Sequence, residues 1–259
     1  MFFPYKDDNP TILTPYVTVV TIVLTCLVWL VFQAAGTEPG MSQSVCDLGV
    51  IPNRLFGGEI RPVMTQRGPM VLCPDAPSMA WYTVVTSVFL HGGWFHLIGN
   101  MWFLWVFGNN IEDAMGHGRF VAFYLFCGIL AALAQILVQP GSPVPMVGAS
   151  GAISGIMGAY LVLYPKARVH VLVLLFVFIT RFSVPAYLML IYWAVLQALG
   201  GLPTIAGASS GGGVAFLAHL GGFVAGLLTI RLFAKPELLA AHKARTEIEV
   251  HTRRPPGLF

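Results

Sequence analysis

The chain has 259 residues, of which 56% are hydrophobic and only 10% are charged, and its mean hydropathy is +0.76. Soluble globular proteins carry about 25% charged residues, so this composition excludes an ordinary soluble domain and predicts a polytopic membrane protein with one domain. The net charge of +3 is too small to indicate binding to nucleic acid.

Six apolar segments approximate the ~20 residues that a helix needs to cross ~30 Å of hydrocarbon. In chain order they are roughly residues 15–35, 94–110, 120–138, 148–164, 184–199 and 214–233. We therefore expect an all-α fold with six membrane-spanning helices. Two more apolar stretches are ambiguous. Residues 81–91 are interpreted as an interfacial lead-in to the second span. Residues 169–179 are interpreted as an interfacial segment or as the start of a long, kinked fifth helix.

The positions of lysine and arginine orient the spans, because cytoplasmic loops carry an excess of these residues. The connections at 140–147 and 200–213 hold no charge, whereas the opposite side holds Lys6, Arg119, Lys166, Arg168, Lys235, Lys243, Arg245, Arg253 and Arg254. That side is expected to be cytoplasmic, in a prokaryotic inner (plasma) membrane. The predicted organisation is a tail at 1–13, a membrane domain at 14–235 with a long outer loop at 36–93, and a tail at 236–259.

Four cysteines fall into two groups. Cys26 and Cys127 lie in apolar runs, where cysteine usually serves as a packing residue. Cys46 and Cys73 share the long outer loop. A disulfide between them requires an oxidising compartment and suitable geometry, so the sequence leaves this pairing open.

Uncharged polar residues interrupt three of the apolar segments: His96 and Asn100 in the second, Ser150 in the fourth and His219 in the sixth. Polar groups inside a bilayer are costly and are interpreted as functional by default. Counting back from the cytoplasmic ends at ~1.5 Å per residue gives ~18–24 Å for all of them. They are therefore expected in one layer, ~6–12 Å below the outer edge of the hydrocarbon.

These residue types predict acyl-transfer chemistry by a serine–histidine dyad. Ser150 is the candidate nucleophile and His219 its general base. The side chains of Asn100 and His96, with the backbone N–H of Ser150 at a helix N-terminus, are the candidate oxyanion hole. Ser154, one turn later, is the alternative serine.

Other features of the sequence narrow the chemistry further. His91 lies at the expected interface and is interpreted as structural. No acid remains in the spans to orient the base as in a triad, because the aspartates lie outside the spans or at their ends. The zinc motif His-Glu-x-x-His is absent, and neither a metal nor an organic cofactor is expected.

Small residues recur at helical spacing on two of these spans. They are Gly148, Gly151, Gly155 and Gly158 on the fourth, and Ala218, Gly222 and Gly226 on the sixth. Such surfaces let membrane helices approach closely. A serine and a histidine on different helices need that approach to reach hydrogen-bond distance.

The motifs together resemble those of the rhomboid intramembrane serine proteases. They are His-x-x-x-Asn at 96–100, Gly-x-Ser-Gly at 148–151, and Ala-His-x-x-Gly-x-x-x-Gly at 218–226. Gly-x-x-x-Glu-x-x-x-Gly at 108–116, centred on Glu112, resembles a further motif of the family. The resemblance covers residues 15–233.

The resemblance implies a rhomboid-like six-helix bundle and a serine endopeptidase that cleaves single-span membrane proteins within or near the outer half of the bilayer. It implies the roles given above for Ser150, His219, Asn100 and His96, and no cofactor. The expected partners are transmembrane substrates and the lipid bilayer. Structural support is expected from His91, Glu112 and the motif glycines Gly148, Gly151, Gly155, Gly222 and Gly226.

Two other classes of function are weighed against a protease. The main alternative is a non-catalytic rhomboid-like protein that binds membrane helices and guides their traffic or degradation. Such a protein should have lost its nucleophile or its base, and this chain retains both. A transporter or channel is disfavoured, because the polar groups cluster at one depth. The substrate, its cleavage site, the regulation and the oligomeric state are not encoded in recognisable motifs.

Overall fold

Helices dominate the computed structural model, which describes residues 2–59, 62–65, 68–175, 178–205 and 214–253. Three of the described helices are long and apolar enough to cross a membrane: α6 (His117–Val138), α8 (Ala186–Ile205) and α9 (Phe216–Phe233). Two apolar helices are shorter, α1 (Tyr16–Val31) and α7 (Ser150–Leu163). With α5 (Trp94–Met115), helices lie at all six segments that hydropathy indicated. That all six cross the membrane stays a prediction.

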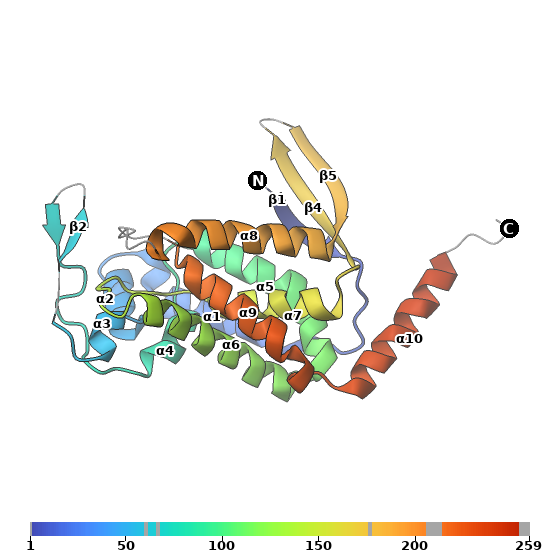
Figure 1. Cartoon of the computed structure of the whole chain (residues 1–259), viewed down its shortest axis with the longest axis horizontal. Coiled ribbons are helices and arrows are strands. Elements are labelled where there is room, and N and C mark those ends of the chain that lie inside the picture. The colour runs from blue at the N-terminus through green and yellow to red at the C-terminus, as the bar shows by residue number, and fades with distance from the viewer. Residues whose placement is uncertain (1, 60–61, 66–67, 176–177, 206–213, 254–259) are drawn as a thin grey trace.

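The helices run side by side as one bundle around α7 (Figure 1). Every residue of α7 from Gly151 to Tyr160 is buried, and the helix contacts α5, α6, α8 and α9. By contrast, α8 buries only Ala186, Leu190, Gly201 and Thr204 among its 20 residues. The helix that begins at Ser150 is therefore enclosed by the bundle, whereas α8 lies on its surface.

A three-stranded antiparallel sheet corrects two expectations from the sequence. It pairs β1 (Phe2–Asp7) with β4 (Arg168–Leu175), and β4 with β5 (Phe178–Pro185), in the order β1-β4-β5. The described residues among 169–179 therefore belong to β4 and β5 and are not the start of the fifth helix; their interfacial position stays a prediction. The fold is mostly helical rather than all-α.

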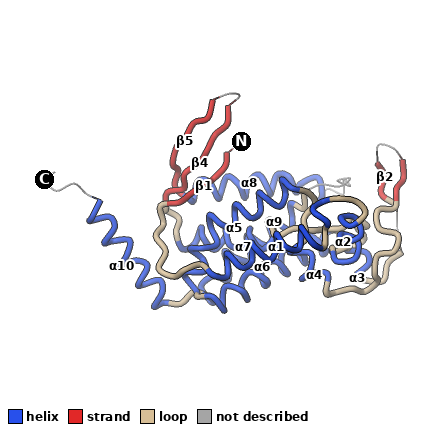
Figure 2. The backbone as a smooth tube through the Cα atoms, turned by 180° about the vertical axis from the view of Figure 1, so that it is seen from behind, coloured by secondary structure: helices blue, strands red, loops and turns tan. Residues whose placement is uncertain are grey.

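The alternation of side chains along β4 explains why this segment forms a strand. Val169 and Val171 are buried against the bundle, whereas Arg168 is exposed and donates a hydrogen bond to Ser183 Oγ at 2.8 Å. A period of two fits a half-buried strand, and β-branched residues favour it. The chain's own N-terminal strand satisfies the hydrogen bonds of one edge of β4. The sheet stands beside the bundle near the end from which α10 (Pro236–Arg253) extends (Figure 2).

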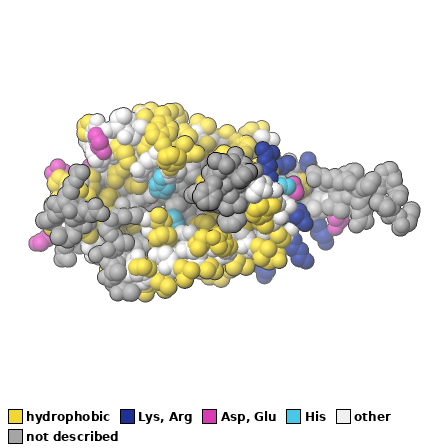
Figure 3. Space-filling model, turned by 90° about the horizontal axis from the view of Figure 1, so that it is seen from above, with side chains coloured by type: hydrophobic (Ala, Val, Ile, Leu, Met, Phe, Trp, Pro, Cys, Tyr) yellow, Lys and Arg dark blue, Asp and Glu magenta, His cyan; other side chains and the backbone are white. Residues whose placement is uncertain are grey.

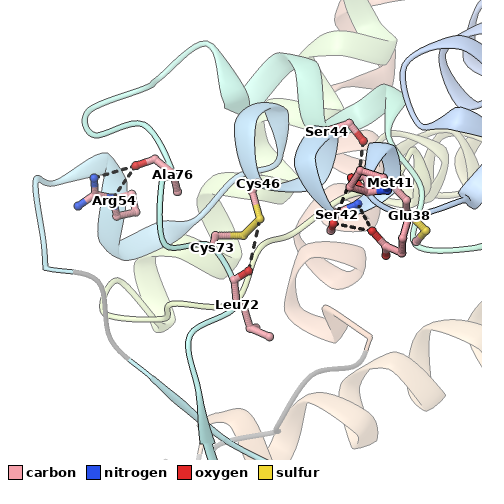
Figure 4. Close-up of a disulfide and its surroundings, with 10 residues drawn as sticks. Glu38, Met41, Ser42, Ser44, Cys46, Arg54, Leu72, Cys73 and Ala76 are labelled. Atoms are coloured by element: carbon pink, nitrogen blue, oxygen red, sulfur yellow. Dashed lines mark hydrogen bonds between the residues drawn. A yellow bond between two sulfur atoms is a disulfide. The ribbon is translucent and has the colours of Figure 1, made fainter.

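The segment between α1 and α5 forms a small subdomain at the opposite end of the bundle (Figure 2). Its elements are η1 (Ala34–Gly36), α2 (Gly40–Leu48), α3 (Pro52–Leu55), β2 (Val63–Thr65), β3 (Gly68–Met70), α4 (Thr83–Thr86) and η2 (Ser87–Phe89). A disulfide joins Cys46 of α2 to Cys73 (Figure 4). Close by, the Arg54 guanidinium donates two hydrogen bonds to the Ala76 carbonyl, at 2.8 and 3.2 Å. Covalent and polar links thus hold this subdomain together.

Charge is distributed unevenly along the bundle (Figure 3). Lysine and arginine side chains gather at the end that carries α10, and hydrophobic side chains cover much of the middle of this face. Large apolar side chains are exposed on α1 and α8; they include Val20, Leu27, Val31, Leu188, Ile191 and Leu199. An apolar belt with a basic end is the surface expected of a protein that sits in a bilayer.

Glu112, at the end of α5, is fully buried and connects three helices. Its carboxylate accepts hydrogen bonds from Val17 N–H at 2.9 Å, and from Thr18 N–H and Oγ1–H at 2.7 Å each. His117, at the start of α6, lies with its Nδ1 2.6 Å from Glu112 Oε1. The first turn of α1 has free backbone N–H groups, and this carboxylate satisfies them.

Glu112→Ala is expected to lower the free energy of unfolding by about 3 kcal/mol, because it leaves buried donors without partners. Glu112→Gln, which retains an acceptor oxygen, should lose less. Unfolding in mild detergent, followed by circular dichroism, measures both. Glu38 is exposed and accepts hydrogen bonds from Ser42 in the first turn of α2, so Glu38→Ala should change stability by less than about 0.5 kcal/mol. Equal losses at the two positions would contradict the role given to Glu112.

Candidate active site

Ser150 and His219 meet in a direct hydrogen bond. Ser150 is the first residue of α7, and His219 lies one turn into α9. The distance from Ser150 Oγ to His219 Nε2 is 2.7 Å. On the other side of the ring, His219 Nδ1 lies 2.8 Å from Oε1 of Gln197, on α8. Because an amide oxygen can only accept, Nδ1 carries the ring proton, and Nε2 is free to accept the serine proton.

Close approach of α7 to α9 makes this contact feasible. A Cβ added at Gly222 would overlap the carbonyl oxygen of Gly151, and one at Gly226 would overlap that of Gly155. At Gly158 an added Cβ would meet the Phe223 carbonyl. The two backbones therefore touch along more than one helical turn, and residues with side chains at these glycines would separate the helices.

Asn100 and His96 lie on one face of α5, toward Ser150. Asn100 is 8% exposed, and its side-chain Nδ2 has no hydrogen-bond partner within the described structure. Gly92 N–H donates to His96 Nδ1 at 3.3 Å, so in the neutral ring Nε2 carries the proton. A Cβ at Gly148 (φ +131°) would lie 2.8 Å from His96 Nε2 and 3.5 Å from Ser150 Oγ. His96 Nε2 therefore lies near the serine hydroxyl, and Asn100 lines the same cavity as Ser150.

A cavity of about 720 Å³ contains these groups. Ser150, His219, Asn100 and His96 line it, together with apolar side chains that include Phe95, Phe103, Met157 and Trp193. A large, mainly apolar cavity with a few convergent polar groups is typical of a binding or catalytic site. No group of three or more potential metal-ligating residues occurs in the part of the chain that the structure describes.

Ser154, the alternative serine, and His91 have local roles. Ser154 Oγ donates to the Ser150 carbonyl at 2.6 Å, the usual packing of a serine inside a helix. His91 is fully buried, and its backbone N–H and C=O both bond the side chain of Gln33, at 2.8 Å each. Burial and the neighbouring His96 lower the pKa of His91 to about 3, so this ring is neutral. Its geometry fits structural support for the start of α5.

Gln197 was missed from the sequence, although the signal was present. It is an uncharged polar residue in the apolar run of the fifth helix, where the criterion applied to the other spans would have selected it. The absence of an acid from the spans predicts a dyad, but a neutral amide such as Gln197 can also accept a hydrogen bond from the histidine. Trp193, one turn earlier, places its ring 6.0 Å from the His219 ring.

The chain is similar in sequence to known proteins. The model of the rhomboid domain matches residues 78–236. The chain is 35% identical over 157 residues to "Rhomboid-like protein 11, chloroplastic" of Arabidopsis thaliana, which is 60% of this chain and 54% of that protein. It is 42% identical over 81 residues to "Rhomboid protease GluP" of Bacillus subtilis, which is 31% of this chain and 15% of that protein. It is 31% identical over 150 residues to "Rhomboid protein 1, mitochondrial" of Saccharomyces cerevisiae, which is 56% of this chain and 40% of that protein.

The aligned part thus spans about half or less of these relatives' own length. The printed names place one of them in chloroplasts and one in mitochondria, and the third comes from a bacterium, so family membership alone assigns no particular membrane. The matched rhomboid domain covers more than half of the 259 residues and contains Asn100, Ser150 and His219. This chain belongs to the rhomboid family of membrane proteins.

Proposed function

We propose that this protein is a serine endopeptidase that cleaves single-span membrane proteins within or near the outer half of the bilayer. The hydrogen bond from Ser150 Oγ to His219 Nε2, at 2.7 Å, carries the proposal. A nucleophile and a base within hydrogen-bond reach are the signature of covalent acyl transfer. The unpartnered Nδ2 of Asn100 beside the same cavity supports it.

In the proposed reaction Ser150 Oγ attacks a peptide carbonyl of the substrate while His219 Nε2 takes the hydroxyl proton. The carbonyl oxygen becomes an oxyanion, which Asn100 Nδ2, His96 Nε2–H and the Ser150 backbone N–H stabilise. His219 then gives its proton to the leaving amine, and an acyl-enzyme remains. Water, deprotonated by His219, attacks the ester, and the second product and the free serine are released.

The length of α7 supports cleavage in the outer half. Its 14 residues span ~21 Å at ~1.5 Å per residue, which is ~9 Å less than the hydrocarbon thickness of ~30 Å. Tyr164, which caps the C-terminal end of α7, packs its ring 4.7 Å from that of His242 on α10, and lysine and arginine gather at the end that carries α10. If that end faces the cytoplasm, Ser150 lies ~9 Å below the outer edge, within the range counted from the sequence.

We further propose six membrane spans, a prokaryotic plasma membrane, and cytoplasmic termini at 1–13 and 236–259. The basic end of the molecule supports the orientation. The Cys46–Cys73 disulfide at the opposite end supports an oxidising compartment on that side. The substrates proposed are transmembrane proteins that enter the 720 Å³ cavity from the bilayer.

Purified full-length protein in detergent, a fluorophosphonate probe and a model single-span substrate test the proposal. The wild type should be labelled and should cleave. His219→Ala should lower both rates at least ~10³-fold without loss of fold, because the serine loses its base. The matched control is His170→Ala, whose ring pairs with Asp8 on the sheet at 2.9 Å; it should retain activity. A folded wild type that binds the substrate but is neither labelled nor active would favour the non-catalytic alternative.

A further inference from the structure

The contact between Gln197 and His219 has a defined orientation. Gln197 Nε2 lies 3.5 Å from the Trp193 carbonyl of its own helix, to which it donates. This donor leaves Oε1 facing the imidazole, 2.8 Å from Nδ1. The Trp193 ring lies against the His219 ring at an interplanar angle of 35°. Two residues one turn apart on α8 therefore restrict both the rotation and the tautomer of His219.

The tautomer determines whether the histidine can work as a base. With a proton on Nδ1, Nε2 has a free lone pair toward Ser150; with the proton on Nε2, the serine proton has no acceptor. After proton transfer the ring is positive, and the Gln197 carbonyl dipole faces the Nδ1–H of the imidazolium. An amide oxygen thus supplies orientation and part of the stabilisation that a buried carboxylate supplies in a triad.

We propose that Gln197 is the positioning residue of His219, so that the site works as a Ser150–His219–Gln197 triad rather than as a dyad. This inference rests on the proposed function. Because Gln197 belongs to α8, the base is oriented only while α8 is seated on α9. Gly200 and Gly201 of α8 pack closely against Phe216 and Leu217 of α9, and this contact fixes the position of α8 on α9. Movement of α8 away from α9 would break the Gln197–His219 bond and disable the base.

Gln197→Leu removes the acceptor at nearly constant volume, and Gln197→Glu retains one. The leucine variant should lower kcat and the rate of fluorophosphonate labelling about tenfold, the equivalent of one hydrogen bond, with KM within about twofold. The glutamate variant should retain most of the activity. The acid limb of its pH–rate profile should move to higher pH, because a carboxylate stabilises the imidazolium. Leu196→Met, at a neighbouring position that is 43% exposed, is the control and should leave all these quantities unchanged.

The outcomes separate the two proposals. A wild type that reacts, with both Gln197 variants labelled at the wild-type rate and with unshifted acid limbs, would overturn the triad and leave the protease intact. A wild type that does not react would remove both. If Gln197→Leu does not fold, judged by its unfolding temperature in detergent, the shift of the acid limb in Gln197→Glu decides alone.

Discussion

Ser150→Ala is expected to reduce cleavage and fluorophosphonate labelling ~10⁴-fold or more. The substitution removes the oxygen that would form the acyl-enzyme, and no neighbouring group replaces it. His219 would remain in place, since its Nδ1 bond to Gln197 is independent of the serine. Labelling followed by mass spectrometry of the modified peptide measures the effect and identifies the modified residue.

Ser154→Ala is the matched control for this prediction, because it deletes the same hydroxyl one turn further along α7. Its Oγ bonds the Ser150 carbonyl at 2.6 Å, and the residue is 1% exposed. Loss of that bond should cost about 1 kcal/mol of stability, and the variant should retain at least a tenth of the activity. Labelling that survives Ser150→Ala but disappears in Ser154→Ala would show that Ser154, and not Ser150, is the nucleophile.

Gly226→Ala is expected to be severely destabilising, by about 3 kcal/mol, and to abolish most activity. The added methyl group would overlap the carbonyl oxygen of Gly155, which is backbone and cannot rotate away. The helices α7 and α9 must then separate, and with them Ser150 and His219. A displacement of about 1 Å between reacting groups costs about 10²-fold in rate. Unfolding in detergent and the cleavage assay measure the two effects.

The control for Gly226 is Gly118→Ala on α6, where an added Cβ meets no atom within 4 Å. This variant should be neutral or slightly more stable, because alanine lowers the entropy of the unfolded chain. If Gly226→Ala were as stable and as active as Gly118→Ala, the close contact of α7 with α9 would not exist in the membrane-embedded protein.

Much of the helical framework was predictable, because an apolar segment in lipid satisfies its backbone hydrogen bonds as a helix without any partner segment. Hydropathy located all six helices to within a few residues, with the largest errors at the ends of the second and fifth. The sheet was not predictable in the same way. Its central strand β4 is paired with β1, more than 150 residues earlier in the chain. The sequence of an apolar segment does not identify a partner strand at that distance. The alternation from Arg168 to Val171 was a local signal that favoured a strand.

The sequence by itself determined that the chain is a membrane protein with rhomboid motifs, and it predicted one depth for Ser150, His219, Asn100 and His96. Depth follows from counting residues along a helix, which needs no neighbour. Only the tertiary structure decided which helices touch and which side chains meet. The Ser150–His219 bond depends on how far α7 and α9 approach and how each is rotated, and contacts between glycine backbones set both. The Gln197–His219 bond depends on where a third helix, α8, packs against α9, and the sequence of no single segment specifies that position.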